Sequence, residues 1–363
     1  MKKIVLGLFA LLFVLTIAGC VDETTTAAPT TAAPTTTVAP TTTVAPTTTV
    51  APTTTAAPTT TAAPTTVEEV EFPVDGQYLA YEVGVSRNAP MVTWVIVTIE
   101  DGEITAFYID CRQGTRTQTA GTDTPDNPDD DTYTFAWNAL TKKELGDDYG
   151  MATEPDQLEW YEQAAEIEAY WLANGYDSVT VDVDGYIDNV AGVTIKDGGY
   201  TTLAAAAVEL ARAGMFQAIL STSDDLYSAT MTVNADGEFS ELLIDVLQGV
   251  PVGATFAWNE FTKQELGDDY GMAGVGGGYT FNGTAWVSSG SPAELEWYEQ
   301  VALITDYVTE NGWNEDLAAI AQRGGTIDGT TLLDDLAGVT IRSQSYYDVL
   351  EALFGYVAAG VIE

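Results

Sequence analysis

The chain carries two copies of one sequence pattern, and this repeat constrains its fold more than any other feature. Three elements recur in the same order, namely F-A-W-N, T-K-x-E-L-G-D-D-Y-G-M and L-E-W-Y-E-Q, at residues 135–138 and 256–259, 141–151 and 262–272, and 158–163 and 295–300. The spacing between copies changes at a Gly/Ser-rich stretch, residues 274–290, as expected of an insertion in a loop. The repeat therefore predicts two folded units, residues 72–214 and 215–363.

Each unit is predicted to be α+β, with strands first and helices interspersed later. An Asp-Gly turn at 101–102 or 236–237 joins two apolar alternating segments in each copy, which predicts a β-hairpin. Helical periodicity with a glycine at the expected stop predicts a first helix in each copy, and a second follows near the end of the copy. The expected helices span residues 159–174, 200–213, 296–311 and 346–358.

The N-terminus is typical of an export signal over residues 1–19. Lys2 and Lys3 precede an apolar stretch that is short for a membrane span, which takes about 20 apolar residues. I-A-G-C at residues 17–20 is similar to a bacterial lipobox, which implies that Cys20 is lipidated and anchors the chain to the membrane. The alternative is a soluble secreted protein in which Cys20 is incidental.

Residues 20–71 are predicted to be a disordered linker. From Thr24 to Thr66 the sequence is little more than A-P-T-T-T-[VA] repeated, and such a composition cannot bury a core. In an extended polyproline II conformation of about 3.1 Å per residue, this stretch would span roughly 130 Å. It would lift the folded part off the membrane, and an O-glycosylated, mucin-like stalk would serve the same role.

Charge and composition exclude several classes of function. The formal net charge is -42 and the chain has no histidine, which excludes Ser-His-Asp catalysis and His-ligated metals. Repulsion from the phosphate backbone excludes nucleic-acid binding. Such acidity favours cationic partners such as metal ions or basic proteins, and a salty habitat would explain it equally well.

Cys111 is the one cysteine left once Cys20 is assigned to lipid, so disulfides are not expected. Aligning D-C-R-Q-G at 110–114 with D-V-L-Q-G at 245–249 pairs Cys111 with Val246. A position that accepts valine is expected to be a small buried apolar site rather than a redox thiol.

A further heptad, D-x-x-A-G-V-T, recurs near the end of each copy, at residues 188–194 and 334–340. It resembles the D-x-x-[ST]-G-A-T motif at which a flavin transferase attaches FMN to a threonine through its phosphate. That family includes the FMN-binding subunits of the Rnf and Nqr redox complexes and two-domain lipoproteins of extracellular electron transfer in Gram-positive bacteria. The resemblance covers the whole folded part. The departures are Ala191 and Ala337 in place of Ser or Thr, and Val193 and Val339 in place of Ala.

The resemblance implies two FMN groups, on phosphoesters to Thr194 and Thr340. The threonine hydroxyl must attack the pyrophosphate of FAD, so the chain is expected to be thin beside it, at Gly192 and Gly338. For the acidic residue upstream, Asp188 or Asp334, the family implies metal or hydroxyl handling by the transferase.

Positive potential for the bound phosphate has two expected sources. The first is the N-terminus of the helix that begins a few residues later. The second is Lys196 or Arg342, two residues past the threonine. Ten lysines and arginines remain once Lys2 and Lys3 leave with the signal, so a matched basic pair is informative, although a solvated charge is the plain alternative.

The longer repeated elements add a matched lysine and several aromatic residues that are candidates for a wall beside the flavin ring. Structural core packing is the more common role for such aromatic residues. The candidates are Lys142, Trp137, Tyr149, Met151 and Trp160 with their counterparts Lys263, Trp258, Tyr270, Met272 and Trp297. The acidic pairs at 147–148 and 268–269 are weak candidates for a cation site, because no loop of alternating oxygen ligands surrounds them.

The predicted function is that of a lipid-anchored cell-surface flavoprotein that relays electrons outward. The resemblance implies a flavin transferase as partner, a membrane quinol or flavoprotein as electron donor, and extracellular acceptors such as ferric iron or soluble flavins. FMN would bring the redox chemistry, and the protein would provide position and electrostatics. The alternative is a structural or adhesive surface lipoprotein with two repeated binding modules. A solute-binding lipoprotein fits less well, since such proteins close two unlike lobes around one cleft.

Overall fold

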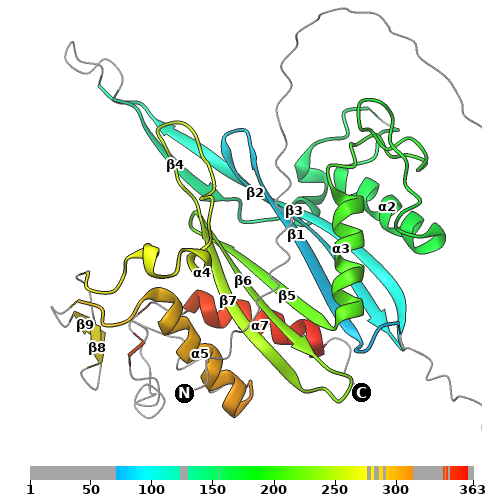
Figure 1. The fold of residues 1–363 in the computed structure, drawn as a ribbon. Helices are drawn as coiled ribbons and strands as arrows, with labels where there is room; N and C mark the ends of the chain where they lie inside the picture. The colour runs from blue at the N-terminus through cyan, green and yellow to red at the C-terminus, as the bar shows by residue number, and fades with distance from the viewer. Residues whose placement is uncertain are drawn as a thin grey trace, which may run out of the picture. The chain divides into compact units, whose positions relative to one another are not determined.

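The structure is a computed structural model that describes residues 71–122, 130–154, 156–275, 279–281, 286–288, 292–313, 338–339, 341 and 344–358. The expected signal peptide, Cys20 and the linker up to residue 70 lie outside this part. Thr66–Glu363 cluster as one compact unit. Its helices and antiparallel sheets confirm the predicted α+β class (Figure 1).

The first copy opens with an antiparallel sheet in the order β1-β2-β3-β4. Its strands are β1 (Gly76–Ser86), β2 (Ala89–Glu100), β3 (Glu103–Thr119) and β4 (Thr132–Trp137). The predicted hairpin is β2-β3. At its turn Asp101 and Gly102 both have positive φ, 54° and 74°, and both donate their backbone N–H to the carboxylate of Asp75. A two-residue turn of this handedness matches the twist of the flanking strands.

Helices complete the first copy. The short α1 (Lys142–Leu145) leads into the 3-10 turn η1 (Gly146–Tyr149), and the longer helices are α2 (Trp160–Asn174) and α3 (Tyr200–Ala213). α2 packs on β3, whereas α3 packs on β1 and β2. Both longer helices lie where helical periodicity predicts them, and the predicted glycine stop of α2, Gly175, is its C-cap.

The second copy repeats this order. Its sheet is β5 (Met215–Thr222), β6 (Asp225–Val233) and β7 (Phe239–Gln248), and its helical elements are α4 (Lys263–Leu266), η2 (Gly267–Tyr270), α5 (Trp297–Asn311) and α7 (Gln344–Ala358). α7 packs on β5 and β6, and α5 on β7. One residue, Gly214, separates the end of α3 from the start of β5.

Three features were not among the expected elements. The opening strands β1 and β5 each add to the predicted hairpin. β3 continues beyond the hairpin to pair with β4. Within the Gly/Ser-rich stretch, β8 (Tyr279–Phe281) and β9 (Trp286–Ser288) pair as a small antiparallel hairpin.

The buried apolar side chains of both copies join in one cluster, which includes Trp160 and Trp171 from the first copy and Phe216 and Trp297 from the second. Cys111 is part of it, with 1% of its surface exposed, and the aligned Val246 is buried too, as the alignment predicts. Burial raises the pKa of the Cys111 thiol, which disfavours the reactive thiolate.

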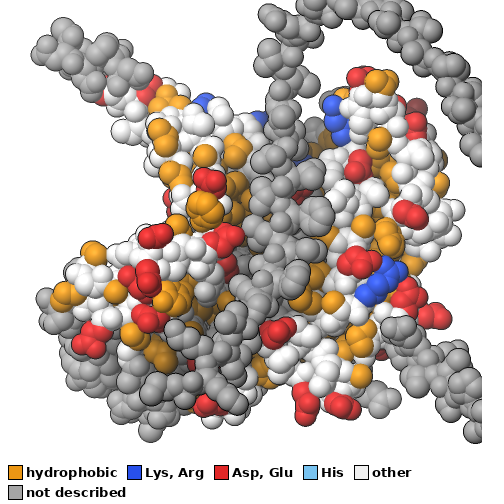
Figure 2. Space-filling model, in the orientation of Figure 1, with side chains coloured by type: hydrophobic (Ala, Val, Ile, Leu, Met, Phe, Trp, Pro, Cys, Tyr) orange, Lys and Arg blue, Asp and Glu red, His pale blue; other side chains and the backbone are white. Residues whose placement is uncertain are grey.

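Acidic side chains are spread over the visible face of the molecule and basic ones are few (Figure 2). In the described part of the chain, no helix is both long and apolar enough to cross a membrane.

Candidate functional site

The motif of the first copy, residues 188–194, forms a turn ahead of α3. Val190 and Val193 are buried, while Ala191, Gly192 and Thr194 are exposed. The two valines therefore hold the turn to the core and leave the threonine at the surface, accessible to a modifying enzyme.

Gly192 has two reasons to be glycine. Its φ is +80°, a conformation that residues with a side chain rarely adopt. A Cβ on it would lie 2.9 Å from Cδ1 of Leu158. Gly338 repeats both features in the second copy, with φ +102° and a Cβ position 3.0 Å from Cδ1 of Leu295. In both copies, the glycine beside the threonine leaves room for a matching leucine, the first residue of L-E-W-Y-E-Q.

A buried glutamine holds the segment that carries the threonine. Oε1 of Gln163, a fully buried side chain on α2, accepts the backbone N–H of Thr194 at 2.7 Å and its hydroxyl at 3.3 Å. The side-chain amide of Gln163 in turn donates to the carbonyl of Leu158. In the second copy Gln300 donates to the carbonyl of Leu295 and accepts the N–H of Ile341, one residue beyond Thr340.

The element L-E-W-Y-E-Q links this motif to T-K-x-E-L-G-D-D-Y-G-M. The carboxylate of Glu159 accepts the backbone N–H groups of Met151 and Ala152, at 2.9 Å each. The hydroxyl of Tyr161 donates to Asp147. The backbone N–H of Ala152 is the main cause that lowers the pKa of Glu159. In the second copy, Glu296 and Tyr298 make the same contacts with Met272, Ala273 and Asp268.

A lysine lies over aromatic rings at this junction in both copies. Nζ of Lys142 is 5.2 Å from the ring centre of Tyr149 and 4.9 Å from that of Trp160. Lys263 is 7% exposed and lies 5.0 Å from Tyr270 and 5.4 Å from Trp297. These are cation–π distances, and burial strengthens such contacts.

A tyrosine in the first turn of the last helix joins the same cluster. Tyr200 meets the edge of Trp160, with ring centres 6.4 Å apart, and Tyr346 packs against Trp297 at 6.1 Å. The indole N–H of Trp297 donates to the hydroxyl of Tyr346 at 2.7 Å. Burial raises the pKa of Tyr200 and of Tyr346 above the ordinary range. The cluster therefore connects the start of α2 or α5 with the start of α3 or α7.

Trp137 and Trp258, the remaining aromatic candidates for a wall beside the flavin ring, contact each other, with ring centres 6.0 Å apart. Phe135 and Trp137 lie at the end of β4, and both contact the matching residues of the other copy.

Asp188 is bound locally. Its carboxylate accepts the hydroxyl of Thr180 at 2.5 Å. The next residue, Asn189, bonds the N–H of Thr180 and the carbonyl of Ser178, so both residues brace the turn against the strand-like segment before it.

Lys196 and the N-terminus of α3, the two expected sources of positive potential, differ in the charges that lie beside them. Nζ of Lys196 lies 4.9 Å from the ring centre of Tyr186, and the lysine is exposed. α3 begins at Tyr200, six residues past Thr194. The carboxylate of Asp197, however, accepts the backbone N–H and the hydroxyl of Thr201 at that end of the helix. A phosphate at the helix N-terminus would meet this negative charge, which leaves Lys196 as the better-placed partner.

Much of the second motif lies outside the described residues, including Asp334, Ala337, Thr340 and Arg342. Gly338 is exposed and Val339 is 9% exposed, so the alternation of an exposed glycine and a buried valine matches Gly192 and Val193.

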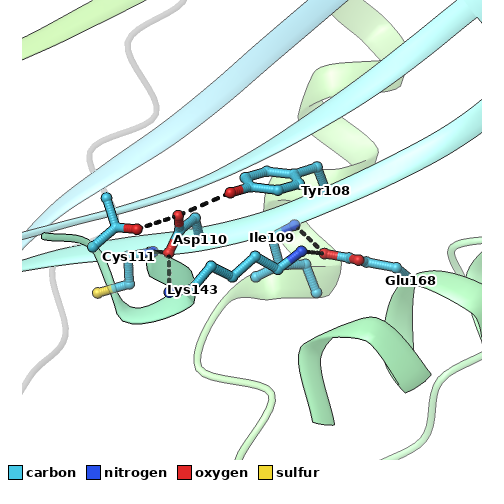
Figure 3. A network of polar contacts seen from close by, with 7 residues as sticks. Tyr108, Ile109, Asp110, Cys111, Lys143 and Glu168 are labelled. Carbon is cyan, nitrogen blue, oxygen red and sulfur yellow. Dashed lines mark hydrogen bonds and ion pairs between the residues drawn. The ribbon is translucent and has the colours of Figure 1, made fainter. Parts of the chain in front are cut away.

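A buried aspartate that was not singled out from the sequence anchors T-K-x-E-L to the sheet. Asp110, 1% exposed, accepts the N–H of Cys111 and of Lys143 and the hydroxyls of Tyr108 and Thr141. Figure 3 shows this network. Asp245 accepts the N–H of Val246 and of Gln264 in the second copy. The signal was available, because this aspartate opens the D-x-x-Q-G alignment.

Beside this network, the ammonium of Lys143 lies 2.5 Å from the carboxylate of Glu168, which also accepts the N–H of Ile109 (Figure 3). Burial raises the pKa of Glu168 and outweighs the opposing effect of Lys143. In the second copy Gln264 replaces Lys143 and bonds the carbonyl of Ile244.

The residues fit an FMN phosphoester on Thr194 in three respects. The threonine is exposed on a braced turn, and glycine keeps the neighbouring backbone thin. An aromatic and cationic cluster lies one helical turn away along α2, since Trp160 and Gln163 both belong to its first turn. The carboxylate of Asp197 is the feature that opposes a phosphate near the helix end.

No family model matches the chain, and no curated protein matches it. A solution NMR structure of a protein from Clostridium thermocellum, from a structural genomics consortium, is similar to 37% of this chain and to 89% of its own length. The two are 23% identical and superpose with a TM-score of 0.23.

Proposed function

We propose that the chain is a two-domain flavoprotein that carries FMN on phosphoesters to Thr194 and Thr340 and relays electrons at the cell surface. The observation that favours this most is that the D-x-x-A-G-V-T motif is held in the same way in both copies. In each copy the motif glycine lies on the leucine of L-E-W-Y-E-Q, and the glutamine of the same element accepts a backbone N–H from the threonine or from its neighbour.

Attachment of FMN to the threonine would be a group transfer without net oxidation. An O–P bond forms between Oγ1 of Thr194 and the FMN phosphorus of FAD, the pyrophosphate P–O bond breaks, and AMP leaves. Gln163 can orient the hydroxyl, since its carboxamide oxygen accepts a hydrogen bond. A carboxamide does not take up the proton, so the base belongs to the transferase.

Bound FMN would supply the electron-transfer chemistry, and this chain would hold and orient it. Lys196 is the candidate partner of the phosphate in the first domain and Arg342 in the second. Lys142 and Lys263, with the aromatic rings around them, are candidates to lie near the ring system. A positive charge near a flavin favours its reduced, anionic form and so raises its potential.

The cellular arrangement follows the sequence. Domains 72–214 and 215–363 would stand on the linker 20–71, anchored through lipid on Cys20. A membrane quinol or flavoprotein would donate electrons, and extracellular acceptors would receive them.

The test is mass spectrometry of protein co-expressed with an active flavin transferase. We expect two FMN phosphoester increments that survive denaturation, one lost in Thr194→Val and the other in Thr340→Val. Thr134→Val, at an exposed threonine on β4, is the matched control and should retain both. An unmodified mass would contradict the proposal and favour the structural or adhesive alternative.

A further inference from the structure

Matching residues of the two copies contact each other. Phe135 packs against Phe256 with ring centres 5.6 Å apart, and Trp137 against Trp258 at 6.0 Å. Each residue occupies the same position of F-A-W-N as the residue that it meets. Contact between equivalent residues is expected where two like units are related by a twofold axis that passes between them.

The opening strands show the same relationship. Gly76 opens β1 and Gly214 precedes β5, and two residues later stand Tyr78 and Phe216. These two fully buried rings are stacked, with centres 4.2 Å apart and planes at 28°. β1 and β5 are in contact along with them.

The helix contacts are reciprocal. α3 of the first copy contacts β5 of the second, and α7 of the second contacts β1 of the first. Each last helix therefore packs on its own sheet and also on the opening strand of the other copy. Reciprocity of this kind distinguishes a twofold interface from a head-to-tail one, in which two different surfaces meet.

We infer that each copy carries the same docking face and that the partner of this face is another copy of the domain. The face consists of the opening strand with Tyr78 or Phe216, the F-A-W-N aromatic residues, and one side of the last helix. In this chain the sister copy, fused in tandem, occupies it. The inference is independent of flavin, because it rests on contacts between the copies and not on the threonine site.

Side chains that differ between the copies explain why the two unlike copies pair. Arg112 donates to the carbonyls of Asn138 and Ala139 in its own copy and to Ser221 Oγ across the interface, at 2.9 Å. The aligned residue of the second copy is Leu247. Arg116 donates to the carbonyl of Ala254, also across the interface.

The matched tryptophans, Trp137 and Trp258, differ in the hydrogen bonding of their indole N–H groups. The indole N–H of Trp258 donates to the carbonyl of Gly84 at 2.8 Å, whereas that of Trp137 is buried and has no hydrogen-bond partner among the residues that the structure describes. The aromatic centre is thus shared by both copies, and the polar contacts around it favour the first copy paired with the second. Specificity commonly arises from such unmatched polar groups.

Hydrogen exchange of the full chain tests the inference. Phe135→Ala changes the first copy only, yet we expect the protection of β6 amides in the second copy to fall by about tenfold or more. Leu140→Ala is the matched control, because it also changes the first copy only and Leu140 is 45% exposed, and it should leave these amides unchanged. Loss of protection confined to the first copy in Phe135→Ala would overturn the inference.

Cleavage of the joint is an independent test. A protease sequence is inserted between Ala213 and Gly214, and the cleaved protein is examined by size exclusion at micromolar concentration. We expect the two fragments to remain one complex, and Arg112→Leu, which installs the residue of the second copy, to speed their separation by about tenfold. Fragments that separate at once while each keeps its circular dichroism would overturn the inference. If the insertion prevents folding, hydrogen exchange of the uncut chain still decides.

Discussion

Gln163 accepts both the backbone N–H and the hydroxyl of Thr194 through one buried oxygen atom. Gln163 is fully buried and Thr194 is exposed, so this pair of hydrogen bonds links a core side chain to a surface residue. In the second copy the equivalent oxygen of Gln300 accepts the N–H of Ile341, one residue beyond Thr340. The glutamine therefore holds the same segment in both copies.

Gln163→Met is expected to release the threonine segment. Methionine fills the same space but cannot accept the N–H of Thr194, and the lost hydrogen bonds are worth about 0.5–1.5 kcal/mol each. The amide of Thr194 should exchange faster with solvent, and flavin loading of the first domain should slow. Gln300→Met is the control, and it should leave the Thr194 amide protected. An unchanged exchange rate of the Thr194 amide in Gln163→Met would show that the turn at residues 188–194 is stable without this hydrogen bond.

Gly192→Ala is expected to destabilise the protein more than Gly185→Ala. Both glycines have similar positive φ, +80° and +85°, so both changes cost about 1–2 kcal/mol of backbone strain. A Cβ meets Leu158 at position 192 and nothing within 4 Å at position 185. Overpacking adds about 1–3 kcal/mol at the first position. Chemical denaturation measures both values, and equal losses would refute the close approach.

Leu158→Ala should reduce the additional cost of Gly192→Ala, because it removes the atom that the new Cβ meets. The comparison is a double-mutant cycle, which isolates the pairwise energy of neighbours. Additive losses would mean that the strain lies in the backbone alone.

Glu168→Gln should change how stability depends on pH. Because burial raises the pKa of Glu168 in the folded state, the folded state favours the protonated form. The contribution of this group is therefore fully present below the unfolded pKa of about 4.3 and is lost as the pH rises through the folded value. The melting temperature of the wild type minus that of Glu168→Gln should therefore fall as the pH rises above the unfolded pKa. Glu166→Gln, at an exposed position on the same helix, is the control. A difference that grows with pH would mean that the Lys143 ion pair dominates.

Trp258→Phe and Trp137→Phe should differ although they occupy one position of the repeat. The first loses the hydrogen bond to Gly84, and the second removes a buried N–H that no described group accepts. The unfolding free energy should fall further for Trp258→Phe, by about 1–3 kcal/mol. Equal losses would show that both indoles are bonded alike.

Periodicity and turn chemistry predicted the hairpins and the long helices, because these depend on local sequence. β1 and β5 escaped prediction, although each contributes buried residues to the core. The segment Tyr78–Ala80 is a continuous buried stretch without the alternation of a half-exposed strand. The motif glycine was recognised from the sequence, but its contact with Leu158 was not, since nothing local relates residues so far apart.

The roles of Gln163 and Asp110 could have been inferred from their repetition alone. A polar residue that recurs on the buried side of an apolar helix or strand needs a partner, because an unpaired buried polar group costs free energy. The position of Trp137 could not be inferred. Its partner lies in the other copy, and a repeat does not indicate how its units pack.

The single residue between α3 and β5 has a consequence for binding strength. Two domains joined by a short connection meet at an effective concentration of the order of millimolar or higher. A docking face with micromolar intrinsic affinity would therefore be almost fully occupied within one chain. The fused pair does not need the same polar contacts from both copies, and the second copy carries Leu247 where the first carries Arg112.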